Sequence, residues 1–305
     1  MLLTLTFRPA LAVGLPVLAT AALALSPTAR AQAPDVPGAR LATIGLSEEF
    51  VLHSQITGKD YLIQVAKPLF PSAPGAKAPV VYVTDGFTML SLTSAPARLL
   101  PLEGLADAAY VVAIGYAADA FLALGALRQH DLVHVVVEND GRPFGGGGAA
   151  FEAFLNDELR PAIEARYPVD HERSVLAGHS LGGLFAATVL ANDPHSFAGY
   201  IIGSPSLQFD PKLADALRAA ASRGNGRPVF IASGEREADF GMTRFTEEVE
   251  AALSGVRSTF DVRRVIFADE THVSVTGPTM SHGLRHVLSP TTSSSATVFP
   301  RSATE

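Results

Sequence analysis

The stretch Gly178-His179-Ser180-Leu181-Gly182-Gly183 decides the fold. Residues 174–177 before it have the pattern of a short buried strand, and residues 184–191 after it are apolar on every side, as in a buried helix. A serine between strand and helix, with a glycine two residues to either side, fits a tight turn that strains the serine backbone and projects its hydroxyl from the sheet. The stretch predicts that Ser180 is a nucleophile; an ordinary glycine-rich turn is the alternative.

Strand and helix patterns alternate along the rest of the chain. Strands are predicted at residues 80–84, 109–114, 200–202, 229–232 and 262–267, and helices at residues 211–222, 240–253 and 275–288. Two alternating segments around the turn Thr57-Gly58-Lys59-Asp60 predict an antiparallel hairpin near the N-terminus. The sequence therefore predicts one α/β domain, residues 41–290, with a mostly parallel twisted sheet and helices on both faces.

The segment between residues 133 and 167 is less regular. Residues 133–137 fit a short strand or an extended loop edge, and four glycines follow at 145–148. A phosphate-binding loop would need Gly-Lys-Ser/Thr after the glycines, so we interpret them as a mobile surface loop. Residues 151–167 have a helical period, which Pro161 should kink or break.

The two ends of the chain differ from the domain between them. Arg8, an apolar run and Ala29-Arg30-Ala31 have the pattern of a signal peptide, residues 1–31. Residues 32–40 would be a flexible leader, and the Ser/Thr-rich residues 291–305 a disordered tail. We expect an exported protein, periplasmic or secreted, without stable membrane insertion after signal cleavage.

Composition excludes several classes of function. The chain has no cysteine, which rules out disulfides, a thiol nucleophile and cysteine metal sites. Its formal charge is −7, and signal cleavage would make it −9 because that segment carries two arginines and no acidic residue. An acidic surface argues against nucleic acid as a partner. The oligomeric state is not indicated.

A serine nucleophile needs a base, and the base needs a carboxylate to orient it. In this kind of fold the order along the chain is serine, acid, histidine. His272, in a polar loop after the last predicted strand, fits the base best. Glu235 is the favoured acid because it comes first after the strand at 229–232, with Glu237 and Asp239 as alternatives.

The oxyanion formed during ester attack needs donors that are already in place. One should be the backbone N–H of Leu181, directly after the nucleophile. The other should come from Gly86 or Phe87, in the turn after the strand at 80–84. No metal or organic cofactor is needed for this chemistry.

Several motifs resemble the esterase D-like esterases, a branch of the α/β-hydrolases, and especially the subgroup that is similar to siderophore trilactone esterases. The resemblance runs from about residue 48 to 289 and is carried by the motifs Pro79–Gly86, Arg128-Gln129-His130-Asp131, Gly178–Phe185, Ser204-Pro205-Ser206-Leu207 and His272-Val273-Ser274-Val275. It implies the α/β-hydrolase fold, the pair Ser180 and His272, Glu235 as acid, and the oxyanion donors named above. Some members of that subgroup work with a serine–histidine dyad.

The sequence thus predicts a serine carboxylesterase that forms an acyl-enzyme on Ser180. A siderophore-type ester or lactone is a candidate substrate, although two segments near the expected substrate side depart from the subgroup. Gln208-Phe209 stands where aromatic residues are usual, and Leu132-Val133 where Thr-Pro is common. Acyl transfer by the same site, or a ligand-binding protein without turnover, are the alternatives.

Overall fold

The computed structural model describes residues 44–70, 75–118 and 121–290. The predicted signal peptide, leader and C-terminal tail lie outside these residues. In the described ranges no helix is both long and apolar enough to cross a membrane.

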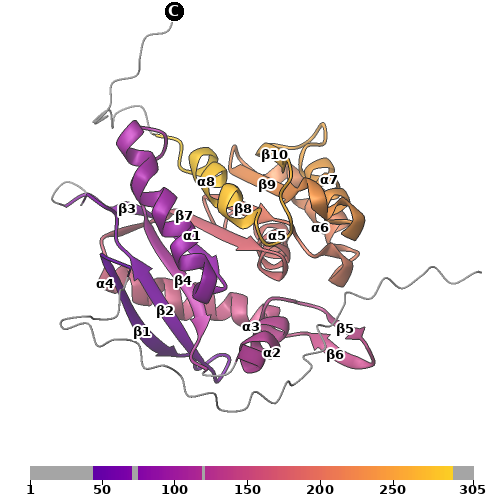
Figure 1. Ribbon diagram of the computed structural model, residues 1–305, viewed down its shortest axis with the longest axis horizontal. Helices are drawn as coiled ribbons and strands as arrows, with labels where there is room; N and C mark the ends of the chain where they lie inside the picture. Colours follow the sequence, from indigo (N-terminus) through magenta and orange to yellow (C-terminus); the bar gives the residue numbers. More distant parts are fainter. Residues whose placement is uncertain (1–43, 71–74, 119–120, 291–305) are drawn as a thin grey trace, which may run out of the picture. The chain divides into compact units, whose positions relative to one another are not determined.

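The centre of the fold is an eight-stranded sheet in the order β1-β2-β4-β3-β7-β8-β9-β10 (Figure 1). Only the pairs β1–β2 and β2–β4 are antiparallel, and the other neighbours are parallel. The strands are β1 Ser47–His53, β2 Asp60–Ala66, β3 Ala78–Thr84, β4 Tyr110–Tyr116, β7 Val169–His179, β8 Gly199–Gly203, β9 Pro228–Gly234 and β10 Asp261–Phe267. The predicted α/β class, parallel sheet and N-terminal hairpin are confirmed.

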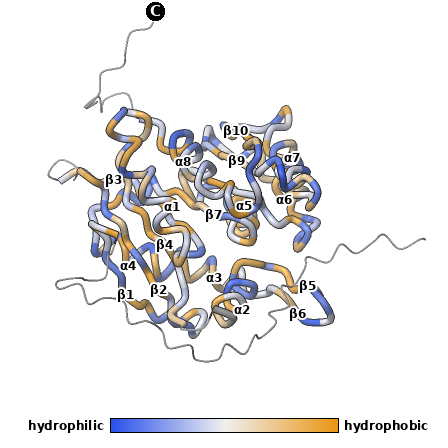
Figure 2. The backbone as a smooth tube through the Cα atoms, in the orientation of Figure 1, coloured by the Kyte–Doolittle hydropathy of each residue, from blue (hydrophilic) through white to orange (hydrophobic). Residues whose placement is uncertain are grey.

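Helices cover both faces of the sheet because its central strands are apolar on both sides. In β3, Val81 and Val83 join the core under α1 and α8, whereas Val80 and Tyr82 join the core under α5 and its neighbours. All seven residues of β3 are buried, as expected for a parallel strand covered twice. The hydrophobic colouring of Figure 2 follows these strands and α5.

The helices predicted at residues 211–222, 240–253 and 275–288 are present, whereas the helix at residues 86–99 was not predicted. The helices of the structure are α1 Gly86–Leu99, α2 Phe121–Asp131, α3 Gly148–Ala153, α4 Arg160–Arg166, α5 Leu181–Asn192, α6 Leu213–Ala220, α7 Met242–Leu253 and α8 Thr276–Val287, with short turns η1 Leu100–Glu103, η3 Leu207–Phe209, η4 Ala221–Arg223 and η5 Glu235–Phe240. Every residue of α5 from Leu181 to Ala191 is buried, which confirms the helix predicted from its apolar sequence.

Pro161 has the predicted effect on the helix around it. Between α3 and α4 the backbone forms a π-helical segment, η2 Phe154–Leu159, and Pro161 lies in the first turn of α4. Proline lacks an N–H and clashes with the preceding turn, so the regular hydrogen-bond ladder is interrupted there.

The four glycines do not form a simple surface loop. They connect a two-stranded ribbon, β5 Val136–Asn139 and β6 Arg142–Gly145, to α3. Gly147 and Gly148 are buried, and a Cβ at either position would overlap the ring of His130 or His134. The interpretation as a surface loop is therefore wrong for these two glycines, which allow close packing of α3 against the end of α2.

Candidate active site

The turn between β7 and α5 has the strained geometry that the sequence predicts. Ser180 has φ 60° and ψ −117°, a backbone conformation that costs on the order of 1–3 kcal/mol for a residue with a side chain. A Cβ at Gly178 would overlap the carbonyl of Gly182, and a Cβ at Gly183 would overlap the carbonyl of Gly203. The glycines are thus required by sterics, and the packing around them holds Ser180 at the carboxyl edge of the sheet.

His272 lies beside this turn. It comes from the loop between β10 and α8, and its ring packs on the ring of His179 with 4.6 Å between centroids. His179 directly precedes Ser180, so the structure brings the predicted base next to the nucleophile's own turn. The Nδ1 atom of His272 lies 2.7 Å from Oε2 of Glu237.

The prediction that Glu235 would be the partner of His272 is corrected by this contact. Glu235 is exposed, and its carboxylate accepts a hydrogen bond from the backbone N–H of Asp269 at 3.0 Å. The chain leaves β9 in the helical turn η5, so the third residue, not the first, returns to the strand end. That residue is Glu237; Asp239, the other alternative, is exposed.

Glu237 is held as an ionised carboxylate in a buried place. Its side chain has no exposed surface, Oε1 accepts hydrogen bonds from the Gly234 N–H at 2.6 Å and the Ser204 hydroxyl at 2.8 Å, and Oε2 faces His272. Burial raises the pKa of Glu237, but the hydrogen bonds from His272, Gly234 and Ser204 outweigh it and hold this pKa below its ordinary value. An ionised carboxylate can only accept, so His272 donates through Nδ1 and its Nε2 is left as the basic atom.

The loop after β8 connects the two halves of the site. Ser204 binds Glu237, and two residues later the Oγ of Ser206 lies 3.3 Å from the Oγ of Ser180. Ser204 has φ 39°, so this loop is also strained. Neither serine was predicted to belong to the site from its chemistry; the motif Ser204-Pro205-Ser206 was only part of the family resemblance.

The proposed oxyanion donors lie at the starts of two helices. Gly86 and Phe87 begin α1, one residue beyond the end of β3. Leu181 begins α5, one residue beyond the end of β7, which is the neighbour of β3 in the sheet. The first N–H groups of a helix have no acceptor within the helix, so they can bind an anion. A Cβ at Gly86 would lie 2.9 Å from the nitrogen of Gly115, which explains the glycine there.

His179 is a second, unexpected histidine in the site. Both of its ring nitrogens are buried without a hydrogen-bond partner. Burial, together with the neighbouring His272, lowers the pKa of His179 to about 3. His179 is therefore neutral at ordinary pH, and the ring of His272 packs against it at an interplanar angle of 44°.

Two further histidines, His282 and His286, lie four residues apart on α8 but face different partners. The ring of His282 packs edge-on against Phe267, and Nε2 of His286 donates to the carbonyl of Asp261 at 3.1 Å. Within the described ranges, no group of three or more His, Asp or Glu side chains is arranged to hold a metal ion.

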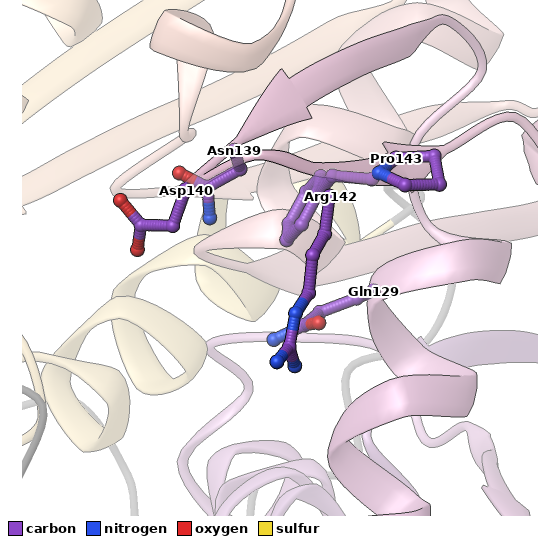
Figure 3. Close-up of a pocket in the computed structure, with 6 residues that line it drawn as sticks. Gln129, Asn139, Asp140, Arg142 and Pro143 are labelled. Atoms are coloured by element: carbon purple, nitrogen blue, oxygen red, sulfur yellow. The ribbon is translucent and has the colours of Figure 1, made fainter.

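A depression of about 390 Å³ lies between α2 and the β5–β6 ribbon (Figure 3). It is lined by Gln129, Asn139, Asp140, Arg142, Pro143 and Phe144. The side chains of Arg142 and Gln129 point toward one another, whereas that of Asp140 points away from both. The ring of Phe144 stacks on Phe209, 4.4 Å between centroids, and Phe209 follows the loop that contacts Ser180. The depression thus adjoins the catalytic edge.

A strained serine at the end of a parallel strand, with a histidine and a buried carboxylate arranged beside it, defines a serine hydrolase of the α/β-hydrolase fold. Residues 54–265 match the model of the family described as "Putative esterase", and the chain belongs to that family. It is an enzyme that acts on ester bonds.

Two relatives of this chain are named as siderophore esterases. The chain is 31% identical to the ferri-bacillibactin esterase BesA of Bacillus subtilis over 274 residues, which is 81% of this chain and 91% of that protein. It is 31% identical to the siderophore enterobactin esterase of Emericella nidulans over 278 residues, 75% of this chain and 91% of that protein. Among solved structures, the BES protein from Bacillus cereus matches with TM-score 0.72 and 27% identity, covering 83% of this chain and 98% of that one.

Proposed function

We propose that this protein is an exported serine carboxylesterase that forms an acyl-enzyme on Ser180 and acts on a siderophore-type ester. The observation that carries the catalytic part is the contact between His272 Nδ1 and the buried carboxylate of Glu237, beside the strained serine. This contact leaves Nε2 of His272 free to act as a base.

In the proposed mechanism, Ser180 Oγ attacks the ester carbonyl carbon while His272 takes the hydroxyl proton. The N–H of Leu181 and that of Gly86 or Phe87 stabilise the oxyanion. The bond to the alcohol oxygen then breaks, and His272 gives its proton to the leaving alcohol. Water repeats the sequence on the acyl-enzyme, with His272 as base, and releases the acid and free Ser180. Glu237 holds the ring orientation and stabilises the imidazolium throughout.

The proposed substrate class rests on the relatives and on the depression beside the site. Two relatives are named for esters of siderophores, bacillibactin and enterobactin. In the depression, which Phe144 also lines, the side chains of Arg142 and Gln129 point toward one another (Figure 3). Such a surface suits an acyl or alcohol group that carries anionic oxygens, despite the overall negative charge of the chain.

Export, to the periplasm or the medium, rests on residues 1–31 alone. N-terminal sequencing of the protein from its own host would test it: a start at Gln32 supports cleavage after Ala31, and a start at Met1 contradicts it.

The catalytic proposal is tested by hydrolysis of a p-nitrophenyl ester series beside Ser180→Ala. We expect turnover of short acyl chains, a loss of about 10⁴-fold or more in kcat for Ser180→Ala, and labelling of the wild type but not the variant by a fluorophosphonate. A folded wild-type protein that neither turns over an ester nor takes the label would contradict the proposal.

A further inference from the structure

Arg128, in α2, reaches the turns that carry both proposed oxyanion donors. Its Nε lies 2.6 Å from Oδ1 of Asp85 and its Nη2 lies 3.1 Å from Oδ2. Nη2 also donates to the carbonyl of His179 at 3.4 Å. The planar fork of a guanidinium matches a carboxylate in this two-point way, which a lysine cannot reproduce.

Each acceptor lies just before one of the donors. Asp85 precedes Gly86 and Phe87, and it has φ 60°, a left-handed conformation that is unfavourable for a residue with a side chain. The carbonyl of His179 precedes Ser180 and Leu181. One guanidinium therefore binds the chain immediately before both halves of the oxyanion site.

The two turns are also in direct contact with each other. A Cβ at Gly182 would overlap the hydroxyl of Thr84 and would lie 3.3 Å from Oδ2 of Asp85. The side chains of Arg128 and Asp85 are largely shielded, 28% and 17% exposed, so their ion pair is less screened than a surface pair. The distance between the two turns is thus set by close packing together with this pair.

The helix that carries Arg128 is itself fixed at its end. Asp131, three residues further on, is fully buried, accepts a hydrogen bond from the Tyr61 hydroxyl at 2.8 Å and pairs with Lys59. The motif Arg128-x-x-Asp131 therefore joins the turn after β3 to the N-terminal hairpin through α2.

We propose that Arg128 is a positioning residue that sets the spacing between the N–H of Phe87 and the N–H of Leu181. The inference rests on the proposed function, which assigns the N–H of Leu181 and that of Gly86 or Phe87 to the oxyanion site, and it takes Phe87 as the second donor. Loss of the fork would let the two donors move apart, and a misplacement of about 1 Å can lower a rate about 100-fold.

The test compares Arg128→Lys with Arg264→Lys. Arg264 makes a similar pair, 2.6 Å from its Nε to Oε2 of Glu250, with a side chain 21% exposed, but it joins β10 to α7. With p-nitrophenyl butyrate, we expect Arg128→Lys to lower kcat about 10- to 100-fold with KM within twofold, and Arg264→Lys to change neither.

A trifluoromethyl ketone provides the second readout, because its serine adduct carries an oxyanion. Its affinity should fall in Arg128→Lys by the same factor as kcat. An unchanged kcat, a change confined to KM, or a full affinity for the ketone would overturn the inference. If Arg128→Lys does not fold, Asp85→Asn breaks the same pair from the other side and is judged by the same criteria.

Failure of the proposed function would look different. The wild-type chain would then neither hydrolyse the ester nor bind the ketone. In that case, crystal structures of Arg128→Lys and Arg264→Lys would decide the inference. The distance between the backbone nitrogens of Phe87 and Leu181 should change by about 0.5 Å or more in Arg128→Lys and stay the same in Arg264→Lys. An unchanged distance in both variants would overturn the inference.

Discussion

Two turns at the carboxyl edge of the sheet carry the nucleophile Ser180 and the buried carboxylate Glu237, and they are built in different ways. The turn after β7 is set by sterics: Gly178 and Gly183 have no room for a side chain, and Ser180 is held with φ 60°. The turn after β9 is set by hydrogen bonds: Glu237 accepts from Gly234, Ser204 and His272. Steric demands leave glycines at fixed spacing in the sequence, whereas hydrogen bonds to distant residues leave no local pattern.

Gly178→Ala is the substitution expected to have the largest effect on the turn after β7, whose conformation is set by sterics. The added Cβ would overlap the carbonyl of Gly182, so we expect a loss of about 1–3 kcal/mol or more in the free energy of unfolding. Gly125→Ala is the control, because Gly125 lies in α2 with open space around it and alanine favours a helix by up to about 1 kcal/mol. Urea unfolding of both variants measures the difference, and equal stabilities would contradict a sterically determined turn.

The turn after β7 should also show a pH signature, through the buried ring of His179. Its folded-state pKa, about 3, is below the ordinary 6.5, so the unfolded chain binds a proton that the folded chain rejects. The stability that follows is complete above pH 6.5 and is lost as the pH falls toward 3. In His179→Phe this loss disappears, and the free energy of unfolding should fall less between pH 7 and pH 5, by on the order of 1–2 kcal/mol. Denaturant unfolding at both pH values measures it, and an unchanged pH dependence would contradict a buried neutral ring.

The smallest effect is expected from a substitution in the depression of Figure 3, and it should change substrate binding alone. For mono-p-nitrophenyl glutarate, which carries a carboxylate, we expect Arg142→Ala to raise KM about three- to fivefold. For p-nitrophenyl pentanoate, which carries no carboxylate, the same substitution should leave KM unchanged. Arg257→Ala, at an exposed position after α7, is the control. Equal effects of Arg142→Ala on both esters would mean that the guanidinium does not recognise the anionic group.

The same contrast explains how far the sequence could be interpreted. The alternation of strands and helices that indicates a parallel α/β sheet, the turn at Ser180 and the loop of His272 follow from local patterns, and the structure has them where they were predicted. The choice between Glu235 and Glu237 depends on the helical turn η5, whose third residue returns to the strand end, and the sequence pattern favoured the wrong one. The Asp85–Arg128 pair joins residues 43 apart in the chain, which no local pattern indicates.

The account's central claim is that Glu237, and not Glu235, orients His272 in a serine esterase. The most direct measurement is kcat for p-nitrophenyl butyrate in Glu237→Gln and Glu235→Gln, two isosteric changes within one turn. We expect Glu237→Gln to lower kcat by about 10²- to 10⁴-fold and Glu235→Gln to stay within about threefold of wild type. A large loss in Glu235→Gln, with Glu237→Gln near wild type, would contradict the account.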